Sequence, residues 1–376
     1  MTTLSLRTAA CCAISATTET GFPAWNVVHL TDHESSGLAA AALQAQVNVG
    51  DLPAVLRQKA RLGWEALSSS TVAMLELFAR GQSRRPELYI DNLPVDVVLP
   101  PTPVRGQSTE VLGSGLSEFV MSTFALALGL PISYLDQRGG RLFHDIYPTA
   151  VNASEVSSQS SSVRLGFHSE MFFHPEPPDF LVLHCLRADR AGQAMTGVAA
   201  VEDITAHLAA AEREILGLDL YAPDLASLHG SYRNQGRAIL ESDPRPVLPV
   251  LGDASSLGGG RVRFEPGLTT ALTVEARLAL ERADDVAEQV AAEGRLCEGG
   301  LLIIDNRRAV HSRSSFPATF DGTDRWLRRM MVGAATDASN GYHDRPDLEI
   351  AAAWAARGVE LRHVPYPAAE HQQVSS

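Results

Sequence analysis

The chain has 376 residues, 45% of them hydrophobic and 20% charged, which is typical of a globular protein with ample material for a core. Its formal net charge of −13 argues against nucleic-acid binding, which needs clustered Lys and Arg. No apolar run approaches the ~18 residues that a membrane span requires, and the four cysteines form neither a disulfide framework nor a CxxC pattern, which favours a reducing cytoplasm.

The first part of the chain, residues 1–110, is expected to form a region of helices and strands packed on the rest of the protein. Apolar residues recur at spacings near three and four in its helical segments. Helices are predicted at 35–47 and 52–80, and short strands at 25–30, 88–90 and 95–99.

Residues 111–335 are expected to form the core. A helix is predicted at about 112–128, and beyond Pro131 short apolar runs separated by Gly, Pro and Asp are typical of an all-β barrel or sandwich. The predicted strands are 141–147, 163–171, 180–186, 193–198, 247–251, 261–264, 301–304, 309–311 and 326–332. Helices are predicted at 202–216 and about 273–293, with a lid at about 218–243 and a C-terminal extension at 336–376 whose end is expected to be disordered.

The motif around which the core is organised is His168-Ser169-Glu170. On a strand, residues two apart point to the same face of the sheet, so the imidazole and the carboxylate would lie side by side. Such a pair is common by chance in a chain with this many acidic residues and is most often a surface pair. A metal site requires a third ligand from elsewhere in the sequence.

That ligand is predicted in residues 299–313, where a buried apolar strand reaches a polar turn at Asp305-Asn306 and returns as a second strand carrying His311. His311 could then join His168 and Glu170. Two His and one carboxylate on one side of an iron form the facial triad of non-haem Fe(II) oxygenases.

Arg325 follows His311 by fourteen residues and begins a further strand, with Arg329 on the same face. A fixed guanidinium near such a metal suits the distal carboxylate of 2-oxoglutarate, which it can hold by two parallel hydrogen bonds. Alone, Arg325 would more often form a surface ion pair, for which Asp321 and Asp324 are available. Arg329 could also act by supporting the metal ligands.

On these motifs, residues 110–335 resemble the Fe(II)/2-oxoglutarate dioxygenases of the clavaminate synthase-like branch in the taurine dioxygenase-like superfamily. This branch includes the arginine and asparagine hydroxylases of peptide-antibiotic pathways. The resemblance implies a distorted jelly roll, or double-stranded β-helix, flanked by N-terminal and inserted helices. It implies that Thr196 joins Arg325 at the 2-oxoglutarate carboxylate, and that Gln137 lies near the amino-acid backbone of the substrate.

The resemblance also identifies residues 261–265 as the place to look for the substrate side chain. Glu265 stands where the family has an acidic residue that holds the polar end of that side chain. Arg263 stands where the arginine hydroxylases have a second acid, which speaks against arginine as the substrate. Asp224, in the predicted lid, is a further candidate contact. Each of these residues also has a simpler interpretation as a turn, cap or solvated strand end.

The sequence therefore predicts an enzyme that uses Fe(II), 2-oxoglutarate and O₂ to hydroxylate an unactivated β or γ carbon of an amino acid or close derivative, in specialised metabolism. Three alternatives stay open: desaturation or ring closure by the same Fe(IV)-oxo chemistry, a zinc or manganese cupin-type isomerase or hydrolase, and a non-catalytic protein that binds 2-oxoglutarate or metal. The expected partner is a small molecule.

Overall fold

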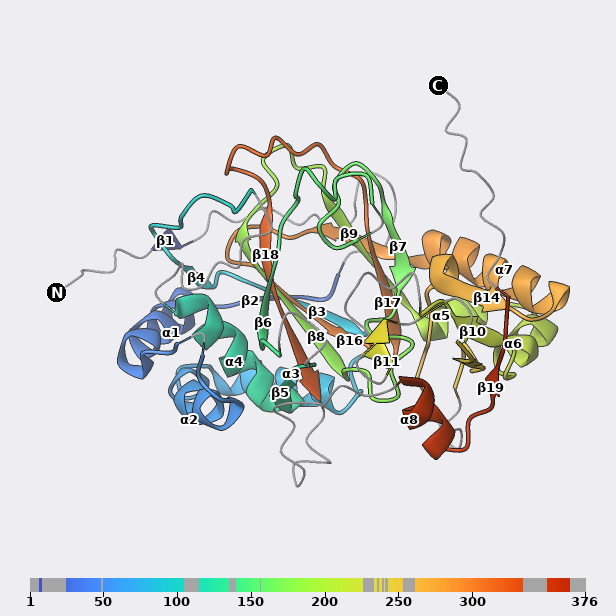
Figure 1. The fold of residues 1–376 in the computed structure, drawn as a ribbon. Helices are drawn as coiled ribbons and strands as arrows, with labels where there is room; N and C mark the ends of the chain where they lie inside the picture. The colour runs from blue at the N-terminus through green and yellow to red at the C-terminus, as the bar shows by residue number, and fades with distance from the viewer. Residues whose placement is uncertain are drawn as a thin grey trace.

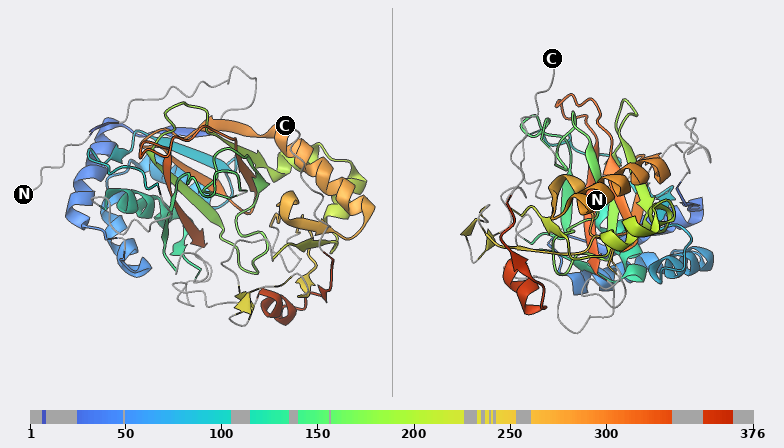
Figure 2. Two further views of the ribbon diagram at one scale, coloured as in Figure 1. Left: turned by 45° about the horizontal axis from the view of Figure 1, so that its top comes forward. Right: turned by 90° about the vertical axis from the view of Figure 1, so that its right-hand side faces the viewer.

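Two facing β-sheets with helices on both outer sides make up the body of the protein, shown here as a computed structural model (Figure 1; Figure 2). The structure describes residues 7–8, 25–48, 50–104, 115–134, 140–155, 157–225, 233–234, 237–238, 240, 243–252, 261–333 and 350–365. Gln137, part of the predicted lid and most of the C-terminal extension lie outside the described residues.

The larger sheet has seven strands in the order β2-β3-β16-β8-β18-β5, with β6 also paired to β18. Its members are β2 (Val27–His29), β3 (Glu87–Asp91), β5 (Leu130–Ile132), β6 (Phe143–Ile146), β8 (Phe180–Arg187), β16 (Leu301–Asp305) and β18 (Trp326–Gly333). All its pairings are antiparallel except that of β2 with β3.

The smaller sheet has four antiparallel strands in the order β15-β9-β17-β7. Its members are β7 (Leu165–His168), β9 (Met195–Ala200), β15 (Ala292–Arg295) and β17 (Ala309–Arg313). His168 of the His168-Ser169-Glu170 motif and His311, the predicted third ligand, therefore belong to neighbouring strands of one sheet.

Strands of the larger sheet are apolar on both faces because each face is covered. In β16, Leu301 and Ile303 pack in one hydrophobic cluster with the N-terminal helices, whereas Leu302 and Ile304 pack in a second cluster toward the smaller sheet. The period of two along a strand divides these side chains between the faces. This double burial explains the continuous apolar run Leu301-Leu302-Ile303-Ile304.

The outer face of the larger sheet is covered by α1 (Asp32–Ala45), α2 (Pro53–Trp64), α3 (Ser69–Ala79) and α4 (Leu116–Leu128). The helical segment predicted at 52–80 is helical over most of its length, but it forms two helices, α2 and α3. The chain leaves helical geometry after Trp64, and Ser68 caps a new helix by accepting a hydrogen bond from the Thr71 amide. Leu67, in the break, is buried in the same core.

The outer face of the smaller sheet is covered by α5 (Val201–Ala206), α6 (Ala210–Leu216) and α7 (Val274–Val290). The helix predicted at 202–216 is thus two helices, and the chain that was expected to extend α7 to residue 293 instead begins β15. Thr273 caps α7 through its hydroxyl, which accepts from the Ala276 amide.

Smaller elements complete the fold. They are the pairs β1 (Arg7–Thr8) with β4 (Pro94–Val95), β10 (Tyr221–Pro223) with β14 (Thr269–Ala271), β11 (Arg233–Asn234) with β12 (Arg237–Ala238), and β13 (Arg245–Pro246) with β19 (Leu361–Arg362), the 3-10 turn η1 (Pro266–Leu268) and α8 (Ile350–Ala356).

Two of the predicted strands are wrong. In the described parts of 247–251 and 261–264 only isolated bridges form, Leu248 with Tyr221 and Leu251 with Val262. Among the described residues, no helix is long and apolar enough to cross a bilayer.

Candidate metal centre and active site

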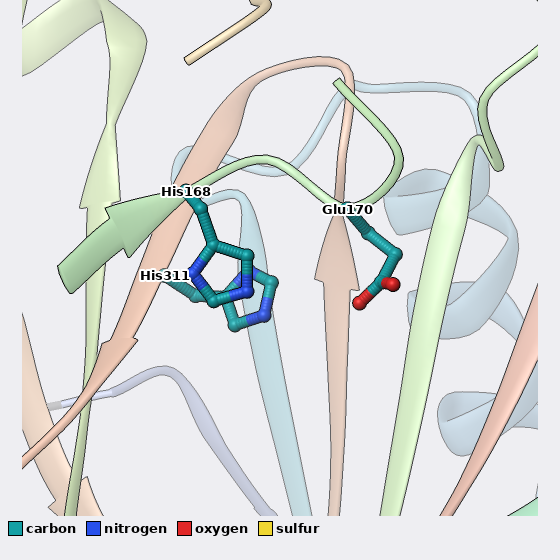
Figure 3. A group of neighbouring side chains, drawn as sticks. All are labelled: His168, Glu170 and His311. Atoms are coloured by element: carbon teal, nitrogen blue, oxygen red, sulfur yellow. The ribbon is translucent and has the colours of Figure 1, made fainter. Parts of the chain in front are cut away.

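His168, Glu170 and His311 converge at one end of the smaller sheet. His168 ends β7 and lies directly opposite His311 of β17 in the antiparallel register, with 4.1 Å between the ring centroids. Glu170 follows two residues later. One possible ligand atom from each residue lies within 4.8 Å of the others. Figure 3 shows the two imidazoles one over the other and the carboxylate directed toward them.

Glu170 is not on the strand that carries His168, contrary to the strand predicted at 163–171. β7 ends at His168 because Ser169 turns to a different neighbour: its amide donates to the Phe264 carbonyl at 2.8 Å, and its hydroxyl accepts from the Phe264 amide at 3.1 Å. Met171 then adopts a left-handed φ of 58°. The two side chains still converge, through a turn in place of strand alternation.

Both imidazoles are prepared to coordinate a metal. The His168 Nδ1 lies 2.9 Å from the Gly166 carbonyl, which can only accept, so Nδ1 carries a proton and Nε2 is the ring nitrogen that can face a metal. His311 is buried, and its Nδ1 has no hydrogen-bond partner among the described residues. Burial, with smaller contributions from His168 and Arg329, holds the pKa of His311 well below its usual value. The donor set of two imidazoles and one carboxylate fits a divalent iron.

A pocket with about 490 Å³ of empty space lies against these three residues, between the two sheets. Thr196 of β9 and Arg325, immediately before β18, line it beside Arg329. The larger sheet adds the apolar wall, with Leu181, Leu183 and Leu327. A small anionic molecule in this pocket would therefore meet both the triad and fixed guanidinium groups.

Arg325 is 7% exposed, yet it makes no ion pair with any described carboxylate. Burial lowers its pKa. A buried guanidinium without an anion is costly, so its position in a pocket beside a metal-ligand cluster indicates a site for an incoming carboxylate.

Arg329 has partners already. Its Nη1 lies 2.9 and 3.0 Å from the two carboxylate oxygens of Glu170, and its Nη2 lies 3.0 Å from His144 Nδ1. It therefore links the carboxylate of the triad to β6, which agrees with the supporting role that the sequence left open for it.

Of the predicted substrate-side residues, Glu265, Arg263 and Asp224 are described, and none of these three lines this pocket. The Glu265 carboxylate is buried, with Oε2 3.9 Å from His168 Nδ1. Burial raises the pKa of Glu265 to about 7, although His168 acts in the opposite direction. The Arg263 Nη1 donates to the carbonyls of Phe172 and His174 at 2.7 and 2.8 Å.

Asp224 is half-buried, and its amide donates to the Leu268 carbonyl at 2.7 Å. Contact with the substrate stays a prediction for Asp224, Glu265 and Arg263, and also for Gln137, which lies outside the described residues.

Sequence reasoning missed several residues of the site. Arg313, two residues beyond His311 on β17, lines the pocket and donates to Ser160 Oγ at 2.6 Å. Burial and the neighbouring Arg325 lower its pKa to about 10. Period-two alternation from His311 was a signal that could have identified it. Ser158 and Ser312 line the same pocket, and Asn306 contacts the Glu170 backbone.

The chain matches the model of the family described as "Taurine catabolism dioxygenase TauD, TfdA family" over residues 107–331, and it belongs to this family of dioxygenases. The L-asparagine oxygenase of Streptomyces coelicolor is 33% identical over 314 residues, covering 83% of this chain and 86% of that protein. The L-lysine 3-hydroxylase of Catenulispora acidiphila is 32% identical over 290 residues, covering 76% and 77%.

Solved structures give the same family. Asparagine oxygenase in complex with Fe(II), (2S,3S)-3-hydroxyasparagine and succinate matches with a TM-score of 0.72 and 28% identity, covering 85% of this chain and 98% of that one. The non-haem iron oxygenase OrfP in complex with Fe and α-ketoglutaric acid matches with a TM-score of 0.67 and 28% identity, covering 82% and 94%.

Proposed function

We propose that the protein is an Fe(II)/2-oxoglutarate-dependent hydroxylase of a small amino acid or a close derivative, acting at an unactivated β or γ carbon. The observation that carries the proposal is the joint occurrence, in one pocket, of the His168/Glu170/His311 cluster and the unpaired buried Arg325. Relatives that hydroxylate asparagine and lysine support the amino-acid class of substrate.

His168, Glu170 and His311 would hold the iron. When bound, the iron supplies the activation of O₂ that is coupled to decarboxylation of 2-oxoglutarate to succinate. Arg325 and Thr196 would bind the distal carboxylate of 2-oxoglutarate, with Arg329 adding positive charge to the same pocket. The leucine-lined wall between the sheets would favour the exclusion of water from the reacting atoms.

The substrate would approach from the side of Glu265, with Arg263, Asp224 and Gln137 as further predicted contacts. These residues decide which C–H bond is held nearest to the metal, and positioning therefore determines the selectivity. The single carboxylate of Glu265 suits a side chain that ends in a hydrogen-bond donor.

We also infer that the strands of residues 111–335 in the two facing sheets are the two halves of a distorted jelly roll, with residues 1–110 packed on it and adding β2 and β3 to the larger sheet, and with 336–376 as an extension. The antiparallel pairing of the strands of residues 111–335 in both sheets and the match to the dioxygenase structures support this. A cytoplasmic location, expected from the cysteine pattern, belongs to the same proposal.

The test is succinate release from 2-oxoglutarate in the presence of Fe(II), ascorbate and a panel of amino acids, with the product identified by mass. We expect one or a few amino acids to stimulate succinate release and to gain the mass of one oxygen atom. His311→Ala should reduce turnover to background. Absence of stimulation by any amino acid, or full activity with zinc alone, would contradict the proposal. A product that has lost two hydrogens would indicate desaturation or ring closure instead.

A further inference from the structure

The chain that carries Glu170, residues 169–178, runs between β7 and β8 and belongs to neither sheet. Backbone carbonyls of this segment are instead bound by side chains from distant parts of the chain. The donors are Asn306 to Glu170 and Pro178, Arg263 to Phe172 and His174, Trp354 to Phe173, and Tyr134 to Glu176. The Glu170 carboxylate thus belongs to a segment whose backbone is held by hydrogen bonds from side chains and not by strand pairing.

Asn306 acts on Glu170 directly. Its Oδ1 accepts from the Glu170 amide at 2.7 Å, and its Nδ2 donates to the Glu170 carbonyl at 3.0 Å and to the Pro178 carbonyl at 3.0 Å. The side chain is 3% exposed. The carboxamide therefore pairs with both polar backbone groups of Glu170, as the peptide group of a neighbouring strand would.

Asn306 lies in the turn between β16 and β17, and β17 carries His311. The Asn306 amide also donates to the Asp179 carbonyl at 2.9 Å, which joins the turn to the start of β8. One residue thus connects the strand of the distal histidine with the backbone of the carboxylate ligand. His168 needs no such link because β7 pairs with β17 directly.

We propose that Asn306 is a positioning residue that fixes the distance between Glu170 and the two histidines, and that it thereby determines metal affinity. The inference rests on the proposed function, because it assumes that Glu170 is a metal ligand. Residues that orient metal ligands typically contribute 10–100-fold to metal affinity or activity. Asn306 differs from most of these in holding the backbone of the ligand, so its effect does not depend on the protonation of the carboxylate.

The test compares Asn306→Ala with Asn92→Ala. Asn92 is also a buried asparagine whose Nδ2 bridges two distant groups, the Leu30 carbonyl at 2.8 Å and Asp32 Oδ1 at 3.1 Å, but it lies in the N-terminal region. Fe(II) affinity is measured by anaerobic titration calorimetry without co-substrate, and the melting temperature of the metal-free protein is measured separately. The ratio of hydroxylated product to succinate reports on coupling.

We expect Asn306→Ala to weaken Fe(II) binding by about 10–100-fold and to lower the product-to-succinate ratio. Asn92→Ala should lower the melting temperature and leave Fe(II) affinity unchanged. Asn306→Ser, which keeps one donor and one acceptor, should fall between wild type and Asn306→Ala.

Unchanged Fe(II) affinity in a folded Asn306→Ala protein would overturn the proposal, as would an equal loss of affinity in Asn92→Ala. Failure of both Asn306 variants to fold would overturn it too, because Asn306 would then serve the core. The Glu170→Ala variant distinguishes failure of the Asn306 proposal from failure of the proposed function. The metal assignment itself is wrong if wild type does not bind Fe(II), or if Glu170→Ala binds Fe(II) as well as wild type does.

Discussion

Arg325, immediately before β18, and Arg328, near its start, lie three positions apart, and both are buried, with exposed fractions of 7% and 4%. Arg328 faces α4 and is fully paired: its Nη1 donates to Glu118 and to Ser117 Oγ, and its Nε donates to Asp145 at 2.9 Å. Burial opposes its charge, but Glu118 and Asp145 together raise its pKa. Arg325 faces the pocket and has no such partners among the described residues.

The same contrast exists between two buried carboxylates. Glu34 accepts hydrogen bonds from the amides of Thr31 and Ser68 and from the hydroxyls of Thr31 and Thr71. Burial alone would raise the pKa of Glu34, but these bonds lower it to about 2. Glu265, beside the triad, has its pKa raised to about 7. Arg328 and Glu34, which stabilise the fold, have charged or hydrogen-bonding partners among the described residues. Arg325 and Glu265, beside the candidate metal centre, have fewer such partners.

The largest effect is expected for Arg328→Met. Removing one member of a buried ion-pair network leaves Glu118 and Asp145 uncompensated, and such a loss costs about 3–5 kcal/mol of unfolding free energy. Denaturant unfolding measures it. The KM for 2-oxoglutarate should stay within about twofold, since Arg328 lies on the other face of the sheet. A large rise in this KM with unchanged stability would reverse the assignment of the two arginines.

Arg325→Met should give the opposite result. Loss of a charge-assisted, two-pronged contact with a carboxylate costs about 1.5–3 kcal/mol, so the KM for 2-oxoglutarate should rise by about 10–100-fold. The unfolding free energy should be unchanged or increased, because an unpaired buried charge has been removed. Steady-state kinetics and denaturant unfolding of the same preparation test both parts. A variant that loses stability but keeps its KM would show that Arg325 is structural.

Glu34→Gln tests the comparison between the carboxylates of Glu34 and Glu265 through the pH dependence of the unfolding free energy. Because the folded pKa of about 2 lies below the ordinary value of 4.5, ionised Glu34 stabilises the protein above about pH 4.5. This contribution, about 1–2 kcal/mol after allowance for screening, is lost as the pH falls from 4.5 toward 2. The unfolding free energy of Glu34→Gln should therefore fall less steeply over this range than that of wild type. Parallel curves would assign the acid sensitivity to other groups.

Patterns local to the chain were enough to predict the main elements of the fold. The doubly buried run Leu301–Ile304 and the run beginning at Trp326 form strands where their composition predicted them. The break at 65–68 was missed because no Gly or Pro lies within it, although Ser68-Ser69-Ser70-Thr71 carries a capping signal. The clustering of His168, Glu170 and His311, with Arg325 in the same pocket, could be predicted because the spacing of these residues along the sequence is distinctive.

The features of the fold and the site that the sequence did not predict depend on contacts between residues far apart in the sequence. β7 ends at His168 because Ser169 pairs with Phe264, and Glu170 is held by Asn306, 136 positions away. The sequence pattern around Glu170 includes neither Phe264 nor Asn306, so it could not predict these contacts. For the same reason Arg263 could be noticed as an unusual residue, whereas its hydrogen bonds to Phe172 and His174 could be seen only in the folded chain.

The smallest effect is expected for Thr196→Val, which separates the contribution of a neutral hydroxyl in the pocket from that of Arg325. Thr196 is buried on β9, where its backbone pairs with Arg313 and Gly294. Valine has nearly the same shape and favours strands, so the fold should be retained. Loss of one neutral hydrogen bond costs about 1 kcal/mol, and the KM for 2-oxoglutarate should rise about fivefold. The double variant Thr196→Val/Arg325→Met should then show less than the sum of the two effects, because both groups are proposed to bind the same carboxylate. If the two effects on KM are strictly additive, Thr196 contacts a different part of the bound 2-oxoglutarate.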